Sequence, residues 1–147
     1  MKKLLLITII LLLQSYPSFG NPNGKGIICN FEKKTKDRKT YTLGFKFKDN
    51  KVEGSLIDKQ NDEFFITKSE EINFTTTEKK NEWGSIDYRF ELDRKNLKLK
   101  SIEKTTILGY FQCEVHLEKI YLEKMIQLKN QYQSKYNEQL KKLDNKI

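Results

Sequence analysis

Hydrophobic and polar residues alternate with a period of two in short runs along most of the chain. The clearest run sets Ile86, Tyr88, Phe90 and Leu92 against charged neighbours. This alternation is typical of strands that bury one face. We expect eight strands, which lie over residues 27–31, 41–48, 52–57, 63–67, 72–76, 86–92, 97–102 and 105–115.

Short polar segments separate these runs, and the tightest of them is Asp49-Asn50. Both residues tolerate positive φ, so they predict a hairpin turn. No helical segment between the runs is long enough for a parallel crossover, which predicts an antiparallel meander. Because most strands have one polar face, the sheet must close into a barrel or fold into a sandwich to bury the other face.

The hydrophobic period changes at residue 117 from two to the spacing of an amphipathic helix. Its apolar stripe consists of Tyr121, Met125, Leu128, Tyr132, Tyr136, Leu140, Leu143 and Ile147. A helix over 117–147 would be about 45 Å long, whereas a compact domain of this size is only about 36 Å across. We expect the first half to pack on the β domain and the second half to overhang, where it frays or packs against another chain.

The first twenty residues have the organisation of a secretory signal peptide. Lys2 and Lys3 precede an apolar run over residues 4–13, and the small residues Ser18 and Gly20 favour cleavage between Gly20 and Asn21. We therefore expect export to the periplasm or the medium of a bacterial cell, with no membrane-spanning segment in the mature chain. The predicted organisation is a signal peptide over 1–20, an antiparallel β domain over 21–116 and a helix over 117–147.

Export gives the two cysteines, Cys29 and Cys113, an oxidising environment that favours one disulfide bond. Each cysteine shares the parity of its apolar neighbours, so both side chains should face inward. A bond between the first and last strands favours a barrel over a sandwich. The alternatives are two reduced thiols, or a metal site that would need two further ligands besides the single histidine, His116.

The basic charge does not indicate a nucleic-acid partner. The formal net charge is +8, and the chain contains 25 lysines but only three arginines. The positive charge is spread over strands and helix, whereas nucleic-acid-binding proteins cluster it and favour arginine. An AT-rich coding sequence would give the same abundance of lysine. We expect no binding to nucleic acid.

The sequence contains no spacing typical of a catalytic triad, a metal site or a phosphate-binding loop. His116 has the parity opposite to Cys113, so we expect it to face solvent. We expect no enzyme activity, cofactor or metal. Trp83 is a candidate ligand-binding residue that could stack on a ligand at the barrel mouth or fill the barrel interior, and we favour the interior.

Two motifs carry a resemblance to other proteins: Leu92-Asp93-Arg94 followed by Leu97, and the pair Tyr110 and Cys113. With the lysine-led signal peptide and the early Cys29, they resemble short secreted β-rich proteins of AT-rich marine bacteria and their phages. This resemblance implies an exported β domain and no particular activity. Eight strands followed by a helix also look like a calycin, although Gly24-Lys25-Gly26 stands where a calycin has an early Gly-x-Trp.

These features favour a secreted or periplasmic binding module without enzyme activity, whose disulfide-closed β domain holds a small apolar ligand or a surface partner. The alternative is a structural or chaperone-like protein that assembles through its C-terminal helix. Self-association would then use Tyr121, Met125, Leu128 and Tyr132.

Overall fold

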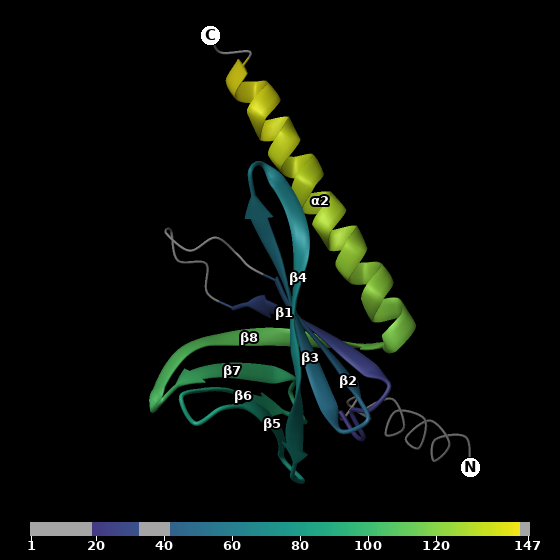
Figure 1. The fold of residues 1–147 in the computed structure, drawn as a ribbon, viewed down its shortest axis with the longest axis vertical. Helices are drawn as coiled ribbons and strands as arrows, with labels where there is room; N and C mark the ends of the chain where they lie inside the picture. Colours follow the sequence, from purple (N-terminus) through teal and green to yellow (C-terminus); the bar gives the residue numbers. More distant parts are fainter. Residues whose placement is uncertain (1–18, 33–41, 145–147) are drawn as a thin grey trace, which may run out of the picture.

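The computed structural model describes residues 19–32 and 42–144 as an eight-stranded antiparallel barrel followed by one long helix (Figure 1). The strands follow one another around the barrel in chain order. They are β1 (Lys25–Phe31), β2 (Thr42–Lys48), β3 (Lys51–Gln60), β4 (Glu63–Thr76), β5 (Lys80–Gly84), β6 (Tyr88–Asp93), β7 (Lys98–Glu103) and β8 (Thr106–Leu117), and the helix α2 is Glu118–Asp144.

β1 closes the barrel because it pairs with β2 along one edge and with β8 along the other. The sheet thus curls into a barrel, and the sandwich is excluded. Cys29 lies directly opposite Cys113 in the β1–β8 ladder, and the two residues form a disulfide with their Cα atoms 4.0 Å apart. The predicted pairing of the cysteines is confirmed.

Aromatic and aliphatic side chains fill the barrel interior, as the period-two alternation predicts. Phe45 and Phe47 of β2 lie there with Leu92 of β6 and Leu99 of β7, and all four are at most 4% exposed. The Cys29–Cys113 bond belongs to the same cluster. The inward faces of strands far apart in sequence therefore form one core.

The strand boundaries differ from the prediction between residues 63 and 84. The two strands expected over 63–67 and 72–76 are one strand, β4, although Lys68, Ser69, Glu70 and Glu71 interrupt its apolar pattern. These residues remain extended because β3 pairs with them, with Ser55 opposite Lys68 and Glu53 opposite Glu71. Backbone pairing with β3, rather than the residues' own hydrophobicity, holds this segment in the sheet.

β5 occupies residues that the polar sequence places in a loop. Its buried residues are Asn81 and Trp83, and they alternate with the more exposed Lys80 and Glu82. A buried asparagine hides the hydrophobic alternation, and the Thr76 hydroxyl donates a hydrogen bond to its Oδ1. Ile86, expected in the next strand, is 88% exposed in the β5–β6 connection, so that strand begins later, at Tyr88.

The helix packs closely on the outside of the barrel because two glycines leave room for it. A Cβ atom at Gly26 would lie 2.3 Å from Tyr121 Cγ, and one at Gly44 would lie 2.5 Å from the Tyr121 hydroxyl. Tyr121 and Met125 are almost fully buried there with Ile28 and Ile57. Burial raises the pKa of Tyr121 to about 12, so the phenol stays neutral over the physiological range.

Farther along, α2 runs beside the β3–β4 hairpin and then extends beyond it (Figure 1). Leu128 and Tyr132 still pack against the outer cluster, which consists of Ile28, Ile57, Tyr121 and Met125. Leu140 and Leu143 are 37% and 60% exposed. The first half packs on the barrel as predicted. The second half was expected to overhang, fraying or packing against another chain, but the rings of Tyr132 and Tyr136 lie 5.8 and 6.2 Å from that of Phe64 in the chain's own β3–β4 hairpin, and only the last turns extend beyond it. No helix in the described ranges is both long and apolar enough to cross a bilayer. Three predicted features lie partly outside the described residues: residues 1–18 of the signal peptide predicted over 1–20, the strand start at Tyr41 and the helix end at Ile147.

We predict that the double substitution Cys29→Ala/Cys113→Ala destabilises the fold. The disulfide closes a loop with a sequence separation of 84, so its loss should lower the free energy of unfolding by about 4–5 kcal/mol in the chain-entropy model. Urea unfolding of the variant and of the oxidised wild type measures this difference. Equal midpoints would show that the β1–β8 ladder holds without its covalent link.

We predict that Gly26→Ala displaces the helix, because the added methyl group overlaps the Tyr121 ring. Overpacking of this kind costs about 1–3 kcal/mol. In a Tyr121→Ala background the same substitution should cost little, and urea unfolding of the four proteins in this double-mutant cycle measures the coupling. An unchanged cost of Gly26→Ala in that background would contradict the close packing of ring on backbone.

Candidate functional site

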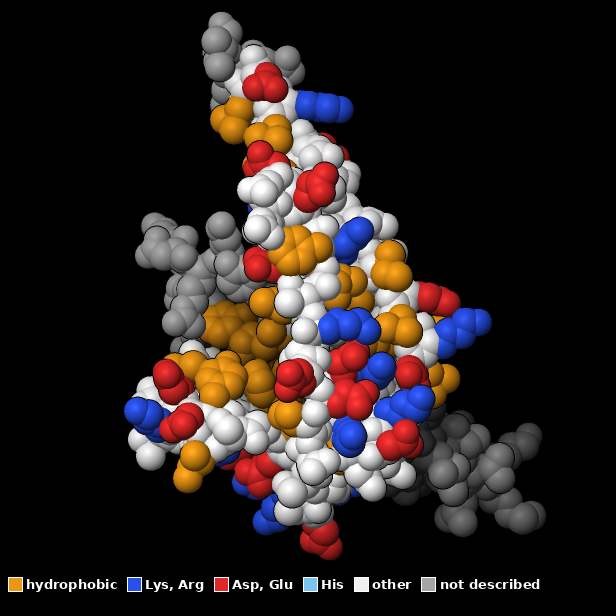
Figure 2. Space-filling view, in the orientation of Figure 1, with side chains coloured by type: hydrophobic (Ala, Val, Ile, Leu, Met, Phe, Trp, Pro, Cys, Tyr) orange, Lys and Arg blue, Asp and Glu red, His pale blue; other side chains and the backbone are white. Residues whose placement is uncertain are grey.

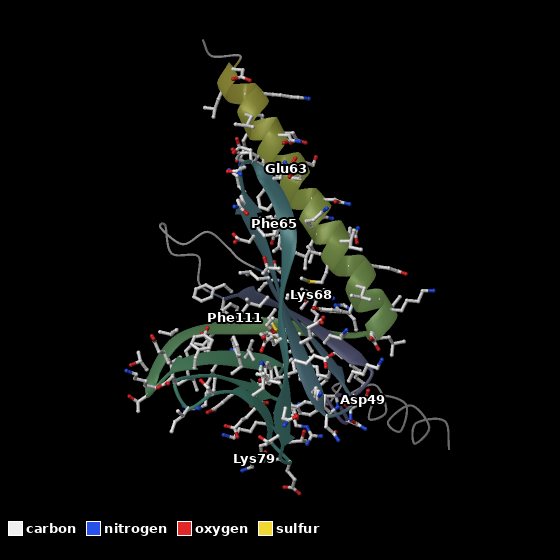
Figure 3. All side chains as sticks on the ribbon, viewed as in Figure 1. Asp49, Glu63, Phe65, Lys68, Lys79 and Phe111 are labelled. Carbon is white, nitrogen blue, oxygen red and sulfur yellow. A yellow bond between two sulfur atoms is a disulfide. The ribbon has the colours of Figure 1, made fainter. Side chains whose placement is uncertain are left out.

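β4 is paired along both edges only near its C-terminal end. It pairs with β3 from Glu63 to Asn73, but with β5 only over three residues, from Phe74 to Thr76. Within the described residues, the part of β4 before Phe74 therefore has no strand on its second side. This part includes Phe65, which lies on the section of the hairpin that rises beside α2 (Figure 3). Unpaired strand edges are sites where a sheet can admit another molecule.

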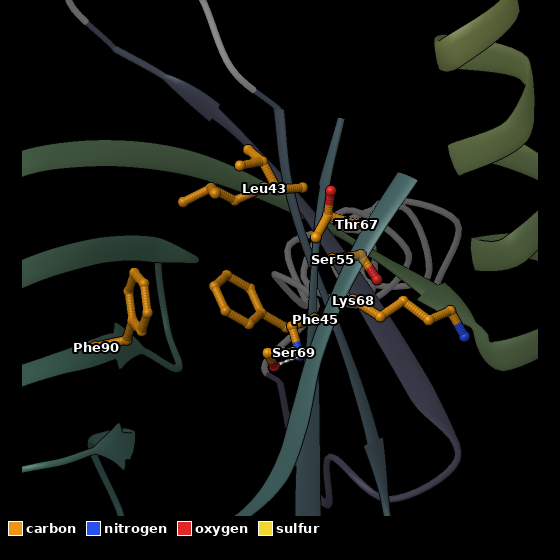
Figure 4. A pocket seen from close by; sticks show the side chains of 9 residues that line it. Leu43, Phe45, Ser55, Thr67, Lys68, Ser69 and Phe90 are labelled. Atoms are coloured by element: carbon orange, nitrogen blue, oxygen red, sulfur yellow. Dashed lines mark hydrogen bonds between the residues drawn. The ribbon is translucent and has the colours of Figure 1, made fainter. Parts of the chain in front are cut away.

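A pocket of about 290 Å³ lies beside this unpaired part of β4 (Figure 4). Strands β2, β3, β4 and β6 contribute its walls, and its surface is almost entirely apolar. The lining residues are Leu43, Phe45, Gly54, Ser55, Leu56, Thr67, Lys68, Ser69 and Phe90. We call it the β4 pocket. Hydrophobic side chains also gather in a hollow beside β4 in the space-filling view (Figure 2).

Aromatic rings form the inner wall of the β4 pocket. Phe45 and Phe90 meet edge to face with their ring centroids 4.9 Å apart. Behind them lies Trp83, 4.9 Å from Phe45 and 5.7 Å from Phe90. Trp83 is only 4% exposed and does not line the pocket, so it fills the barrel interior and supports the two lining rings. The structure thus agrees with the favoured interior placement, and a direct contact of Trp83 with a ligand stays a prediction.

A β-bulge shapes the opposite wall. The β3–β4 register shifts between Glu53 and Ser55, and Gly54 at the bulge donates its backbone N–H to Ser69 Oγ at 2.9 Å. The same Ser69 hydroxyl donates to the carbonyl oxygen of Glu70. This wall was not predicted from the sequence, although a glycine inside an alternating run is a recognised signal of a bulge.

The one ionisable side chain of the pocket lining is that of Lys68, and its charge is directed elsewhere. Lys68 extends away from the pocket toward α2 (Figure 4), and its Nζ lies 3.0 Å from Glu53 Oε1. Glu53 also pairs with Lys46 at 3.5 Å. The pocket interior therefore presents carbon surface and neutral hydroxyl groups, which suits an uncharged apolar molecule.

Helix α2 holds the tip of the β3–β4 hairpin through polar contacts. Gln133 Oε1 accepts the backbone N–H of Phe64 at 2.9 Å, while Gln133 Nε2 donates to the carbonyl oxygen of Asp62 at 3.0 Å. The Tyr136 hydroxyl donates to Asp62 Oδ1 at 2.5 Å, and Lys59 Nζ lies 3.7 Å from the centroid of the same ring. These contacts keep the hairpin, and with it one wall of the pocket, against the helix.

The four helix residues predicted for self-association contact the chain's own barrel. Tyr121, Met125, Leu128 and Tyr132 belong to the outer cluster with Ile28 and Ile57. The Tyr132 hydroxyl also lies 2.6 Å from the Thr42 hydroxyl. Exposed apolar residues of α2 include Leu122 and Ile126, at 41% and 53%. Assembly through the helix stays a prediction, but the predicted face already packs against the barrel of the same chain.

His116 does not face solvent as expected. Its side chain is only 10% exposed, because the helix covers the outer face of β1 and β8 where His116 lies opposite Gly26. Burial, followed by the charge of Lys124, lowers the pKa of His116 below its usual 6.5, despite the nearby Glu114. The ring is therefore neutral at physiological pH. Within the described ranges, no group of three or more His, Cys, Asp or Glu side chains is arranged to hold a metal ion.

Comparisons of the chain with protein-family models, with curated proteins and with solved structures found no match. The geometry of the pocket and the chemistry of its lining are therefore the observations that bear on function.

We predict that Tyr136→Phe raises the pKa of Asp62. The Tyr136 hydroxyl, then the Lys59 ammonium, hold this pKa below its usual 3.8, so the hairpin contact is present above that value and is lost as the pH falls through the lowered pKa. NMR measures the pKa of Asp62 when the side-chain carboxyl ¹³C shift is followed over a titration from about pH 2 to about pH 7, which spans the usual pKa range of aspartate.

Tyr110→Phe is the matched control for this titration, because it removes the hydroxyl group of a 42% exposed tyrosine on β8, which pairs with Lys100 of β7 and not with the hairpin. Its Asp62 titration should match that of the wild type. If Tyr136→Phe also left the titration unchanged, the hydroxyl would not be bound to the Asp62 carboxylate in solution.

Proposed function

We propose that this protein is an exported binding module without enzyme activity, and that it holds a small apolar ligand in the β4 pocket. The observation that carries the proposal is an apolar pocket of about 290 Å³ at the part of β4 that β5 leaves unpaired. The Cys29–Cys113 disulfide supports export, because such bonds persist in oxidising compartments.

The size and lining of the pocket define the class of ligand. Ligand pockets usually measure roughly 300–1,000 Å³, so this one suits a molecule at the small end of that range. Phe45 and Phe90 offer aromatic surface, and Leu43 and Leu56 offer aliphatic surface. Each methylene group that a ligand buries contributes about 0.8 kcal/mol. A compact aromatic or branched aliphatic molecule with at most one or two hydroxyl contacts fits this description best.

The same lining supports binding rather than catalysis. Acid–base or nucleophilic chemistry needs a positioned titratable group at the reacting atoms. Lys68 is the only candidate in the lining, and its ammonium group is paired with Glu53 outside the pocket.

We predict that Thr67→Trp blocks the β4 pocket. Thr67 is an exposed lining residue, so the indole can occupy the pocket without entering the core. The affinity for a naphthalene-sized fluorescent probe should fall by at least about tenfold. Fluorescence titration measures the affinity, and native mass spectrometry of the exported protein shows whether a small molecule is lost with the same substitution.

Thr75→Trp is the matched control, because it adds the same side chain to an exposed position of the same strand that does not line the pocket. Its probe affinity should match that of the wild type. Equal affinity in Thr67→Trp and Thr75→Trp, or no probe binding by the wild type, would exclude the β4 pocket as the binding site.

A further inference from the structure

Phe19 occupies a second site at the end of the barrel formed by the turns that follow β4 and β6. Its side chain is 1% exposed, and its ring meets Phe47 edge to face at 5.7 Å. Lys25 Nζ lies 5.6 Å from the centroid of the Phe19 ring. The ring is thus held as a core side chain is, although the sequence predicts that it belongs to the removable leader.

Arg94 both accepts a hydrogen bond from the backbone of Phe19 and donates one to it. The Phe19 N–H donates to the Arg94 carbonyl oxygen at 3.0 Å, and Arg94 Nε donates to the Phe19 carbonyl oxygen at 2.8 Å. Arg94 is itself fixed by the β4–β5 turn, because its N–H donates to the Lys79 carbonyl and its Nη1 donates to the Thr77 carbonyl. Arg94 therefore binds the backbone N–H and carbonyl groups of Phe19, in addition to the packing of its ring.

The predicted cut between Gly20 and Asn21 falls between two separately anchored segments. On the far side of the cut, Asn23 exchanges hydrogen bonds with Asn50, and Gly24 donates its N–H to the Phe47 carbonyl. Asn21 is exposed. Cleavage would therefore leave the mature N-terminus in place and free Phe19 from its tether. A residue held intramolecularly loses its high effective concentration when the link is cut, so it would leave the site.

A buried polar group lies in the same part of the barrel. Asn81, in the strand that follows the Thr77–Lys80 turn, is fully buried, and its Nδ2 has no hydrogen-bond partner among the described residues. A buried donor without an acceptor is costly unless a water molecule or a ligand satisfies it.

We propose that, in the processed chain, this end of the barrel is a binding site for an aromatic residue of an extended peptide, with Phe19 as its occupant in the precursor. The ring enters the space beside Phe47, and Arg94 exchanges two hydrogen bonds with the peptide backbone. The site is distinct from the β4 pocket, whose lining includes neither Phe47 nor Arg94. The inference goes beyond the proposed function and uses only the predicted position of cleavage.

The test begins with the exported protein, whose intact mass gives its N-terminus. It is then titrated with the capped tripeptide acetyl-Ser-Phe-Gly-amide, which copies residues 18–20, and with acetyl-Ser-Ala-Gly-amide. We expect an N-terminus at Asn21 and at least about tenfold tighter binding of the phenylalanine peptide, with NMR shifts at the Arg94 Nε–H and at the Phe47 amide. An N-terminus at or before Phe19, or equal binding of the two peptides, would overturn the proposal.

Two variants of the β6–β7 turn form a matched pair. Arg94→Gln removes the guanidinium that holds the peptide carbonyl and should weaken binding about tenfold, whereas Lys95→Gln removes an exposed charge from the same turn and should leave binding unchanged. Equal effects would contradict the role of Arg94. If Arg94→Gln does not fold, the comparison of the phenylalanine and alanine peptides on the wild-type protein still tests the proposal. Thr67→Trp should bind the peptide normally, so failure at one site is distinguished from failure at the other.

Discussion

Strand β1 is buried on both faces, and the rest of the molecule depends on this. Its inward side chains Ile27 and Cys29 enter the barrel core, while Gly26 and Ile28 lie under the helix. Strands with one face in solvent need only one hydrophobic set, but β1 needs two. It also pairs with β2 and β8 at once. The seven residues of β1 therefore take part in barrel closure, in the disulfide and in the packing of the helix.

The helix has an effect on the pocket as well as on the core. By packing on β1 and β2, it covers one side of the barrel, and its second half supports a β3–β4 hairpin longer than the neighbouring strands. That hairpin extends past the end of β5, so this part of β4 has no second partner strand among the residues that the structure describes. The barrel is therefore open beside β4 because α2 holds the β3–β4 hairpin in a position that β5 does not reach.

The sequence predicted the architecture well because period-two alternation determines which side chains face the barrel interior. Alternation placed Phe45 and Phe90 inside, and the expectation of an oxidising environment paired Cys29 with Cys113. The pocket was not predictable in the same way. It depends on how far β5 extends, and β5 was hidden by the buried Asn81. It depends also on a bulge at Gly54, whose position is set by pairing with a distant segment. His116 was misplaced because period-two parity does not show that a helix covers the outer face.

The ladder between β1 and β8 has a consequence for the order of events during synthesis. Its residues are separated by most of the chain, for example Lys25 from Leu117. Contacts between distant segments form only after both have left the ribosome, and they form slowly because a long loop must close first. The β1 residues thus remain without their second partner until β8 has been made, and the helix that covers them comes later still. A chain with this topology has no closed barrel until β8 has been made.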